Sequence, residues 1–134
     1  MSENAAKKID SVLIVDDDDN IRLITHMSLE GLTSWKIREA RSGKEALKCL
    51  ASELPDLILL DVMMPDMTGM DLMGQARTQH GDNLPLIIFM TAKVQASEIE
   101  KYRSLGAAGV IMKPFDPMKL PEQIEQAVAN FCSS

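Results

Sequence analysis

The stretch "VLIVDDDDN", from Val12 to Asn20, decides the fold because a short apolar run ends directly in four aspartates. A run of this length and composition is typical of a buried β-strand. Neighbouring carboxylates repel one another, so the aspartates cost free energy unless a cation or water screens them. One interpretation is a solvated loop whose acids favour the N-terminus of the next helix. The other is a metal site, and the run alone leaves both open.

The bulk composition indicates one globular domain. The chain has 134 residues, and 46% of them are hydrophobic. Its net charge is −6, which argues against binding to nucleic acid. Its longest apolar runs are far shorter than a membrane span. Residues 1–10 lack the apolar core of a secretory signal and are interpreted as a polar tail. Cys49 and Cys132 fit reduced thiols, so we expect a cytoplasmic protein.

Apolar runs alternate with segments of helical period along the whole chain. The expected strands are residues 11–15, 36–40, 56–60, 86–90 and 108–112. Four of these runs are apolar nearly throughout, as in strands that are covered on both faces, whereas 36–40 is more polar and suits a sheet edge. Strict alternation of strands and helices predicts an α/β doubly wound parallel sheet with right-handed crossovers.

Several helix ends carry their own signals. Ser42 begins an S-x-x-E capping box, and Thr68 begins a weaker T-x-x-D pattern. The start of the last helix stays open: Asp116-Pro117 is one candidate, with aspartate as the cap and proline in the first helical position. Pro121 conflicts with this start, because it would remove a hydrogen bond one turn into the helix.

Polar side chains follow four of the five strands. In parallel doubly wound sheets, ligands bind outside the carboxyl ends of the strands. Taken singly, each side chain has an ordinary explanation, such as a turn former, β-propensity or a solvated lysine. Together, carboxylates, a hydroxyl and an ammonium at one edge of one sheet predict a binding site. Its members are Asp16 and Asp17, Asp61, Thr91 with Ala92 behind it, and Lys113.

The inventory of this predicted site favours phosphoryl chemistry. Two or three carboxylates on strand ends suit a hard divalent cation such as Mg²⁺. A lysine and a threonine hydroxyl suit a phosphoryl group. The chain has no GxxxxGK[ST] loop, and neither His26 nor His80 lies in a catalytic motif. Asp61, at the end of the central apolar run, is the best placed to act as a nucleophile and form an aspartyl phosphate.

Four motifs at these separations resemble the receiver domain of bacterial two-component response regulators. They are "LIVDDD", "LLDVMMPDMTG", "IFMTA" and "VIMKPF". The resemblance covers about residues 10–132, and the receiver domain is expected at 11–132. Because no segment remains for an output domain, the likeness is to the stand-alone chemotaxis-regulator type. The resemblance implies a flavodoxin-like, five-stranded sheet of order 2-1-3-4-5 with five helices.

The resemblance also implies a set of metal ligands. Asp61 would accept a phosphoryl group from a sensor histidine kinase or a phosphotransfer protein. Asp17 and Asp61 would bind Mg²⁺ directly, Met63 would lend its backbone carbonyl, and Asp16 would act directly or through water. The next two aspartates would then be the pair that caps the following helix, so each interpretation of the run applies to half of it.

The remaining implied roles concern the phosphoryl group. The Thr91 hydroxyl and the Ala92 N–H would hold phosphoryl oxygens, and Lys113 would pair with the phosphoryl charge. The resemblance further implies a cis peptide between Lys113 and Pro114, which would direct the lysine inward.

The chain departs from the family pattern in ways that bear on switching. The family often places an aromatic residue three positions before the lysine, where this chain has Val110, and Tyr102 is not equivalent by position. Met63 and Lys93 occupy the two variable positions that tune dephosphorylation. A bulky apolar Met63 beside the phosphoryl group would block water, so we expect a long-lived phosphoryl form.

The leading interpretation is a phosphorylation-switched module, not an enzyme beyond its own phosphorylation and dephosphorylation. Its partner face would be the fourth helix, fifth strand and fifth helix, on a monomer or a phosphorylation-dependent dimer, without contact to nucleic acid or membrane. A Mg²⁺-dependent phosphohydrolase with Asp61 as its nucleophile is an alternative. Such enzymes usually carry a D-x-D motif at the nucleophile, and here Met63 stands in place of the second aspartate. A phosphorylation-independent binding module is another, although such modules typically lose the Asp, Thr or Lys.

Overall fold

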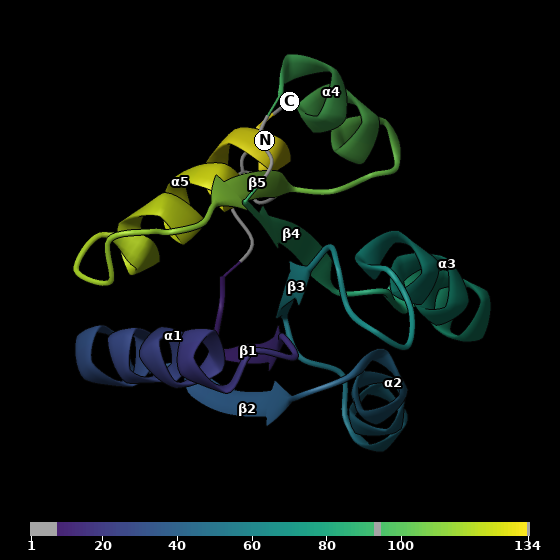
Figure 1. Cartoon of the computed structure of the whole chain (residues 1–134), viewed down its shortest axis with the longest axis horizontal. Coiled ribbons are helices and arrows are strands. Elements are labelled where there is room, and N and C mark those ends of the chain that lie inside the picture. Colours follow the sequence, from purple (N-terminus) through teal and green to yellow (C-terminus); the bar gives the residue numbers. More distant parts are fainter. Residues whose placement is uncertain (1–7, 93–94, 134) are drawn as a thin grey trace.

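The computed structural model describes residues 8–92 and 95–133, which form one parallel sheet with helices on both faces (Figure 1). The strands are β1 (Ser11–Val15), β2 (Lys36–Ala40), β3 (Leu57–Asp61), β4 (Leu86–Thr91) and β5 (Gly109–Met112). The helices are α1 (Asp19–Leu32), α2 (Gly43–Ser52), α3 (Gly69–His80), the short 3-10 helix η2 (Gly81–Asn83), α4 (Ala96–Ser104) and α5 (Leu120–Cys132). Lys93 and most of the expected tail lie outside the described residues.

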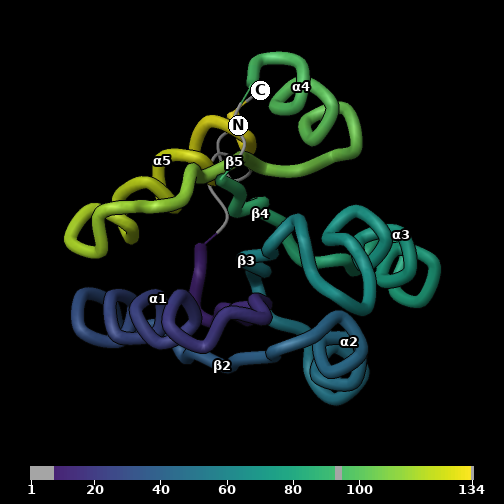
Figure 2. Tube along the Cα trace, in the orientation of Figure 1, coloured from purple at the N-terminus to yellow at the C-terminus, as the bar shows by residue number. Residues whose placement is uncertain are grey.

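The sheet has the strand order β2-β1-β3-β4-β5, and every pair of neighbouring strands is parallel. Helices α1 and α5 lie on one face, while α2 and α3 lie on the other, as Figure 2 shows along the chain trace. This confirms the predicted doubly wound, flavodoxin-like fold with five α-helices. In the described ranges, no helix has the length and apolar character needed to cross a membrane.

The core forms two layers because successive side chains of a strand point to opposite faces of the sheet. On one face, buried residues such as Leu13, Leu60 and Phe89 pack against α2, α3 and α4. On the other, residues such as Ile14 and Leu59 pack against α1 and α5. All five residues of β3 are buried, whereas β2, at the sheet edge, has only its last residue buried. The polar character of β2 thus marks the edge strand, as predicted.

Of the two expected capping boxes, the one with the weaker sequence pattern forms completely and the other forms only in part. Ser42 caps α2, since its side chain accepts a hydrogen bond from Glu45 N at 3.0 Å. The Glu45 carboxylate, however, accepts a hydrogen bond from Arg41 N at 3.0 Å and not from Ser42 N, so the capping box is incomplete. The weaker pattern is the complete one: Thr68 and Asp71 exchange side-chain and backbone hydrogen bonds at the start of α3.

Helix α5 begins three residues after Pro117, the candidate first residue in the sequence. Residues 117–119 form a turn, in which the Asp116 carboxylate accepts a hydrogen bond from Met118 N at 2.9 Å. The helix itself starts at Leu120, so Pro121 lies in its first turn. The first N–H groups of a helix have no intrahelical partner, so proline costs no hydrogen bond there. The candidate start at Asp116-Pro117 is therefore not the observed one, and the conflict with Pro121 disappears.

Candidate functional site

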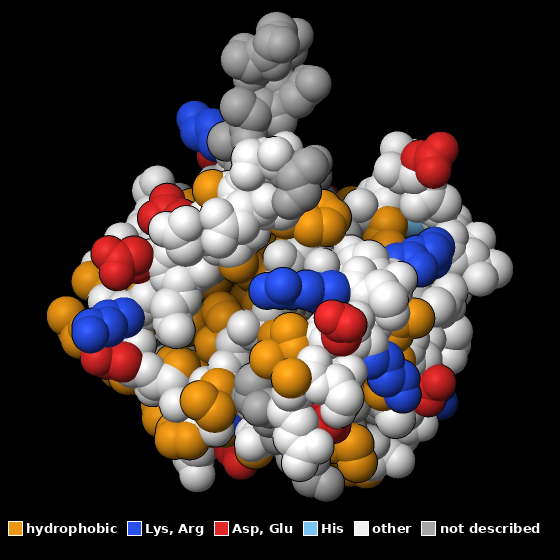
Figure 3. Space-filling model, turned by 90° about the horizontal axis from the view of Figure 1, so that it is seen from above, with side chains coloured by type: hydrophobic (Ala, Val, Ile, Leu, Met, Phe, Trp, Pro, Cys, Tyr) orange, Lys and Arg blue, Asp and Glu red, His pale blue; other side chains and the backbone are white. Residues whose placement is uncertain are grey.

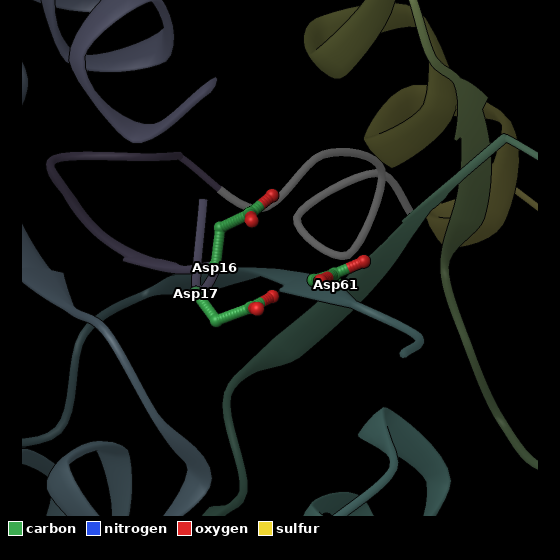
Figure 4. A group of neighbouring side chains, drawn as sticks. All are labelled: Asp16, Asp17 and Asp61. Carbon is green, nitrogen blue, oxygen red and sulfur yellow. The ribbon is translucent and has the colours of Figure 1, made fainter. Parts of the chain in front are cut away.

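The carboxyl ends of four strands border one cavity of about 460 Å³. Its lining includes every residue expected at these strand ends, namely Asp16, Asp17, Asp61, Thr91, Ala92 and Lys113, together with Met63. One carboxylate oxygen from each of Asp16, Asp17 and Asp61 lies within 4.8 Å of the others. Figure 4 shows these three side chains, called here the acidic cluster, as neighbours from the ends of β1 and β3.

The register of the sheet brings the first two members of the cluster together. Val15 of β1 pairs with Leu60 of β3. Asp16 and Asp61 are the next residues of these strands, so they are neighbours across the ladder. Asp61 is the last residue of β3 and is only 7% exposed. The sheet therefore holds its carboxylate at the base of the cavity on a rigid strand end.

Lys113 reaches the same carboxylates from β5. Thr91 pairs with Met112, and Lys113 N, one residue on, donates to Thr91 O at 2.9 Å. The Lys113 ammonium lies 2.7 Å from Asp16 Oδ2 and 3.1 Å from Asp61 Oδ1. It thus bridges the two buried members of the acidic cluster in charge-assisted hydrogen bonds.

Burial and charge set the protonation of this group. The pKa of Asp61 is raised to about 6, because burial and the negative charge of Asp16 raise it by more than the Lys113 ammonium lowers it. Burial alone would lower the pKa of Lys113, but its hydrogen bonds and charge pairing with Asp16 and Asp61 outweigh this, and its pKa is raised. Three carboxylates against one bridging ammonium leave an excess of negative charge. Carboxylate oxygens are also the donor set that Mg²⁺ prefers, so the residues fit this ion.

The aspartate run divides into two parts with different contacts. Asp16 is buried, and its Oδ1 accepts a hydrogen bond from Asp18 N at 2.9 Å. Asp18 is the N-cap of α1, since its Oδ1 accepts from the N–H groups of the second and third residues that follow it. Asp19 lies in the first helical turn, where its carboxylate pairs with Arg22 at 2.6 Å. The capping interpretation is thus confirmed for Asp18, whereas Asp19 forms an ion pair instead of a cap and Asp16 belongs to the acidic cluster.

The other expected residues surround the acidic cluster. Thr91 is buried, at 5% exposed, and Ala92 follows it as an exposed residue of the loop after β4. Met63 borders the cavity with a side chain that is 69% exposed. The peptide between Lys113 and Pro114 is cis, as the resemblance implies.

Helix α4 contributes cavity residues that sequence reasoning did not assign to the site. Glu98, Lys101 and Tyr102 line the cavity. Tyr102 is buried, and its ring lies 5.0 Å from that of Phe89, centroid to centroid. Phe89 also pairs with Val110 in the sheet, so an α4 aromatic lies close to the position where the family often has its own. No pattern in the sequence of α4 indicated that this helix borders the cavity.

The fold and the grouping of these residues agree with a match to a known family. A family model, the response regulator receiver domain, matches residues 12–125. The chain therefore belongs to the receiver domains of two-component response regulators.

Particular relatives support this assignment. Response regulator SaeR of Staphylococcus aureus is 37% identical over 121 residues, which are 89% of this chain and 50% of that protein. A probable cyclic di-GMP phosphodiesterase of Vibrio cholerae is 35% identical over 123 residues, which are 90% of this chain and 27% of that protein. The chain thus spans half or less of the length of these curated relatives.

Solved structures support the fold independently. The chemotaxis response regulator CheY4 of Vibrio cholerae has a TM-score of 0.81 and 28% sequence identity. The similarity covers 90% of this chain and 99% of that one.

SaeR and the phosphodiesterase are named for different functions, and this chain matches only part of each. No activity of either whole protein is therefore assigned to this chain.

Proposed function

We propose that this receiver domain is a phosphorylation-switched signalling module that accepts a phosphoryl group on Asp61. The donor would be the phosphohistidine of a sensor histidine kinase or of a phosphotransfer protein. The observation that carries the proposal is the position of the Asp61 carboxylate: it is buried at a strand end, held 3.1 Å from the Lys113 ammonium, and grouped with Asp16 and Asp17. A nucleophile, a counter-charge and metal ligands thus meet in one cavity.

In the proposed reaction, a carboxylate oxygen of Asp61 attacks the phosphorus atom of the donor. The bond between phosphorus and the imidazole nitrogen breaks, its electron pair stays on that nitrogen, and an acyl phosphate forms on Asp61. Because the pKa of Asp61 is about 6, most of these side chains are ionised at neutral pH even without a metal. Thr91, the Ala92 N–H and Lys113, at the adjacent strand ends, would hold the transferred oxygens.

The acidic cluster would hold Mg²⁺ together with the backbone carbonyl of Met63. When bound, the ion supplies positive charge to the phosphoryl oxygens. The support for this role is chemical, since carboxylates of this kind, brought within 4.8 Å of one another, repel unless a cation offsets them.

Phosphorylation would act as a switch because it changes the partners of Lys113. The ammonium now divides its hydrogen bonds between Asp16 and Asp61. A phosphoryl group carries a charge of roughly −2 and adds acceptor oxygens, so it would draw Lys113 and Thr91 toward itself. Thr91 is the last residue of β4 and Lys113 directly follows β5, so the two residues precede α4 and α5 respectively in the chain.

The partner surface in this proposal is the side formed by α4, β5 and α5, which Figure 3 faces. Charged side chains of both signs lie there among apolar patches. A hollow of about 390 Å³ lies between these elements, lined by residues that include Arg103, Glu122 and Ala127. The downstream protein would bind here, and the chain would act as a monomer or form a dimer on phosphorylation.

The proposal extends to the limits and location of the module. We assign residues 11–132 to the receiver unit and residues 1–10 to a polar tail, in a cytoplasmic protein that catalyses only its own phosphorylation and dephosphorylation. The phosphohydrolase alternative gains no support, because Met63 stands where such enzymes have their second acid.

Intact-protein mass tests the proposal directly. After incubation with Mg²⁺ and acetyl phosphate, we expect one added phosphoryl group on the wild-type chain. The gain should be lost in Asp61→Asn and in the presence of a chelator. Asp82→Asn is the matched control and should gain the group, because Asp82 lies in η2, which precedes β4 and is therefore at the amino ends of the strands, away from the cavity. A chain that gains no mass under any condition would instead be a phosphorylation-independent binding module.

A further inference from the structure

Arg22 of α1 contacts the backbone next to the acidic cluster, and its place in the sequence does not indicate this contact. Its Nη1 donates a hydrogen bond to the backbone oxygen of Asp16 at 2.8 Å. That carbonyl belongs to the peptide that joins Asp16 to Asp17, and both residues belong to the cluster. The N–H of Asp16 is held as well, by Ala40 O at 3.1 Å. The chain at the end of β1 is thus fixed from β2 on one side and from α1 on the other.

The guanidinium that makes this contact is itself held in place. Its Nη2 lies 2.6 Å from Asp19 Oδ1, and its Nε lies 3.0 Å from Glu39 Oε1. The other oxygen of Glu39 contacts the imidazole of His26. The Arg22 side chain is only 14% exposed. Each of its three nitrogens therefore has its own acceptor, which leaves the planar group little freedom to turn.

We propose that Arg22 is a positioning residue for the metal and phosphoryl site, acting through the Asp16–Asp17 peptide. This inference rests on the proposed function, because it assigns Arg22 a part in preparing that site. Rotation of this peptide would move the Asp17 carboxylate relative to Asp61, and the hydrogen bond from Arg22 opposes that rotation. Residues that orient metal ligands from outside typically change affinity by about 10–100-fold when they are substituted.

The sign of the effect separates positioning from simple electrostatics. Arg22 is a cation near a site for another cation, so its charge alone would weaken Mg²⁺ binding. Removing the charge would then make the metal bind more tightly. Positioning predicts the opposite result, because loss of the hydrogen bond frees the Asp16–Asp17 peptide and the metal binds more weakly.

The test is Mg²⁺ affinity of the unphosphorylated chain, measured by calorimetry and by amide chemical shifts. We expect Arg22→Gln to raise the Kd for Mg²⁺ by about tenfold. Arg22→Lys should recover only part of the loss, since an ammonium lacks the fork that reaches three acceptors. Arg38→Gln is the matched control. Arg38 also donates to two backbone carbonyls, those of Cys49 and Glu53, but these lie at α2, away from the acidic cluster. Its Kd should stay within about twofold.

The outcomes distinguish this inference from the proposed function. A wild-type chain that binds no Mg²⁺ contradicts both. If the wild type binds Mg²⁺ while Arg22→Gln binds it equally or more tightly, only the positioning role is overturned. Urea unfolding of each variant shows whether it is folded at the titration temperature. Should Arg22→Gln fail to fold, Glu39→Ala removes the acceptor that holds Arg22 Nε, and an unchanged Kd in that variant would overturn the role.

Discussion

Replacing Asp61 with asparagine should stabilise the metal-free protein, although it removes the proposed phosphoryl acceptor. The Asp61 carboxylate is buried beside Asp16, and these two effects outweigh the attraction of Lys113 and raise its pKa from 3.8 to about 6. A raised pKa means that the ionised side chain is less stable in the folded chain than in the unfolded one. The amide carries no charge, so this penalty is absent in the variant. Lys113 keeps its partner Asp16, at 2.7 Å, and is not left unpaired.

The magnitude follows from the size of the shift. A shift of about two pKa units corresponds to about 3 kcal/mol. The cavity opens to water and Lys113 offsets part of the cost, so we reduce this figure to about 1–2 kcal/mol at pH 7.5. For a domain of this size, such a gain raises Tm by roughly 3–8 °C.

The sign of the pH dependence is also determined. Below pH 3.8, the carboxyl is protonated in both states and the penalty is absent. The penalty grows as the pH rises between 3.8 and about 6, because the unfolded chain ionises first, and it is complete above that range. The stabilising effect of Asp61→Asn should therefore be largest at pH 7.5 and fall to about half at pH 5.

Urea unfolding in the presence of a chelator, at pH 7.5 and pH 5, measures this effect. Asp82→Asn, an exposed aspartate in η2, serves as the control and should change stability by less than about 0.5 kcal/mol. The reasoning would be refuted by an Asp61→Asn protein that is no more stable than the wild type at pH 7.5. A gain of equal size at both pH values would also refute it, because the effect would then not come from ionisation.

Further predictions concern the cavity and its supports. Met63→Asn should shorten the lifetime of the phosphorylated form several-fold by admitting water, as followed by the decay of the added mass; an unchanged half-life would contradict the shielding role. Gly69→Ala should cost about 2 kcal/mol in urea unfolding, because a Cβ there would lie 2.6 Å from Asp61 O; a neutral change would show that the backbone adjusts freely. Thr68→Ala should lower the free energy of unfolding in urea by about 1 kcal/mol, because the N-cap hydrogen bond of α3 is lost; an unchanged stability would show that water satisfies the freed N–H group equally well. Mg²⁺ at about 100 times its Kd should stabilise the wild type by about 2.7 kcal/mol and Asp61→Asn by less, so equal gains in Tm would argue against Asp61 as a ligand.

Much of the architecture follows from patterns that act over a few residues. Apolar runs covered on both faces alternate with helical segments, and this alternation predicts a parallel doubly wound sheet. The polarity of 36–40 correctly marks the edge strand. The strand order came from the family resemblance, since alternation does not specify which strands are neighbours. The same alternation also places the strand ends on one edge, so the list of site residues was available before the structure.

Local patterns were less reliable at helix ends. The sequence offers several residues that can cap a helix, and competition between neighbouring hydrogen bonds decides among them. Glu45 binds the N–H of Arg41 instead of completing its box, and Asp116 closes a turn ahead of α5. These choices depend on the path of the backbone before the helix, which the spacing of residues does not contain.

What the sequence by itself determined is the fold class and the kinds of chemical group at the strand ends. Only the tertiary structure decided how those groups meet. Lys113 bridges Asp16 and Asp61 across 97 and 52 positions of the chain, and Arg22 reaches the backbone of Asp16 from the next helix. Such contacts depend on strand register and helix placement, which are set by packing of the whole core. Short-range periodicity carries no information about distances between elements, so these contacts emerge only once the core has assembled.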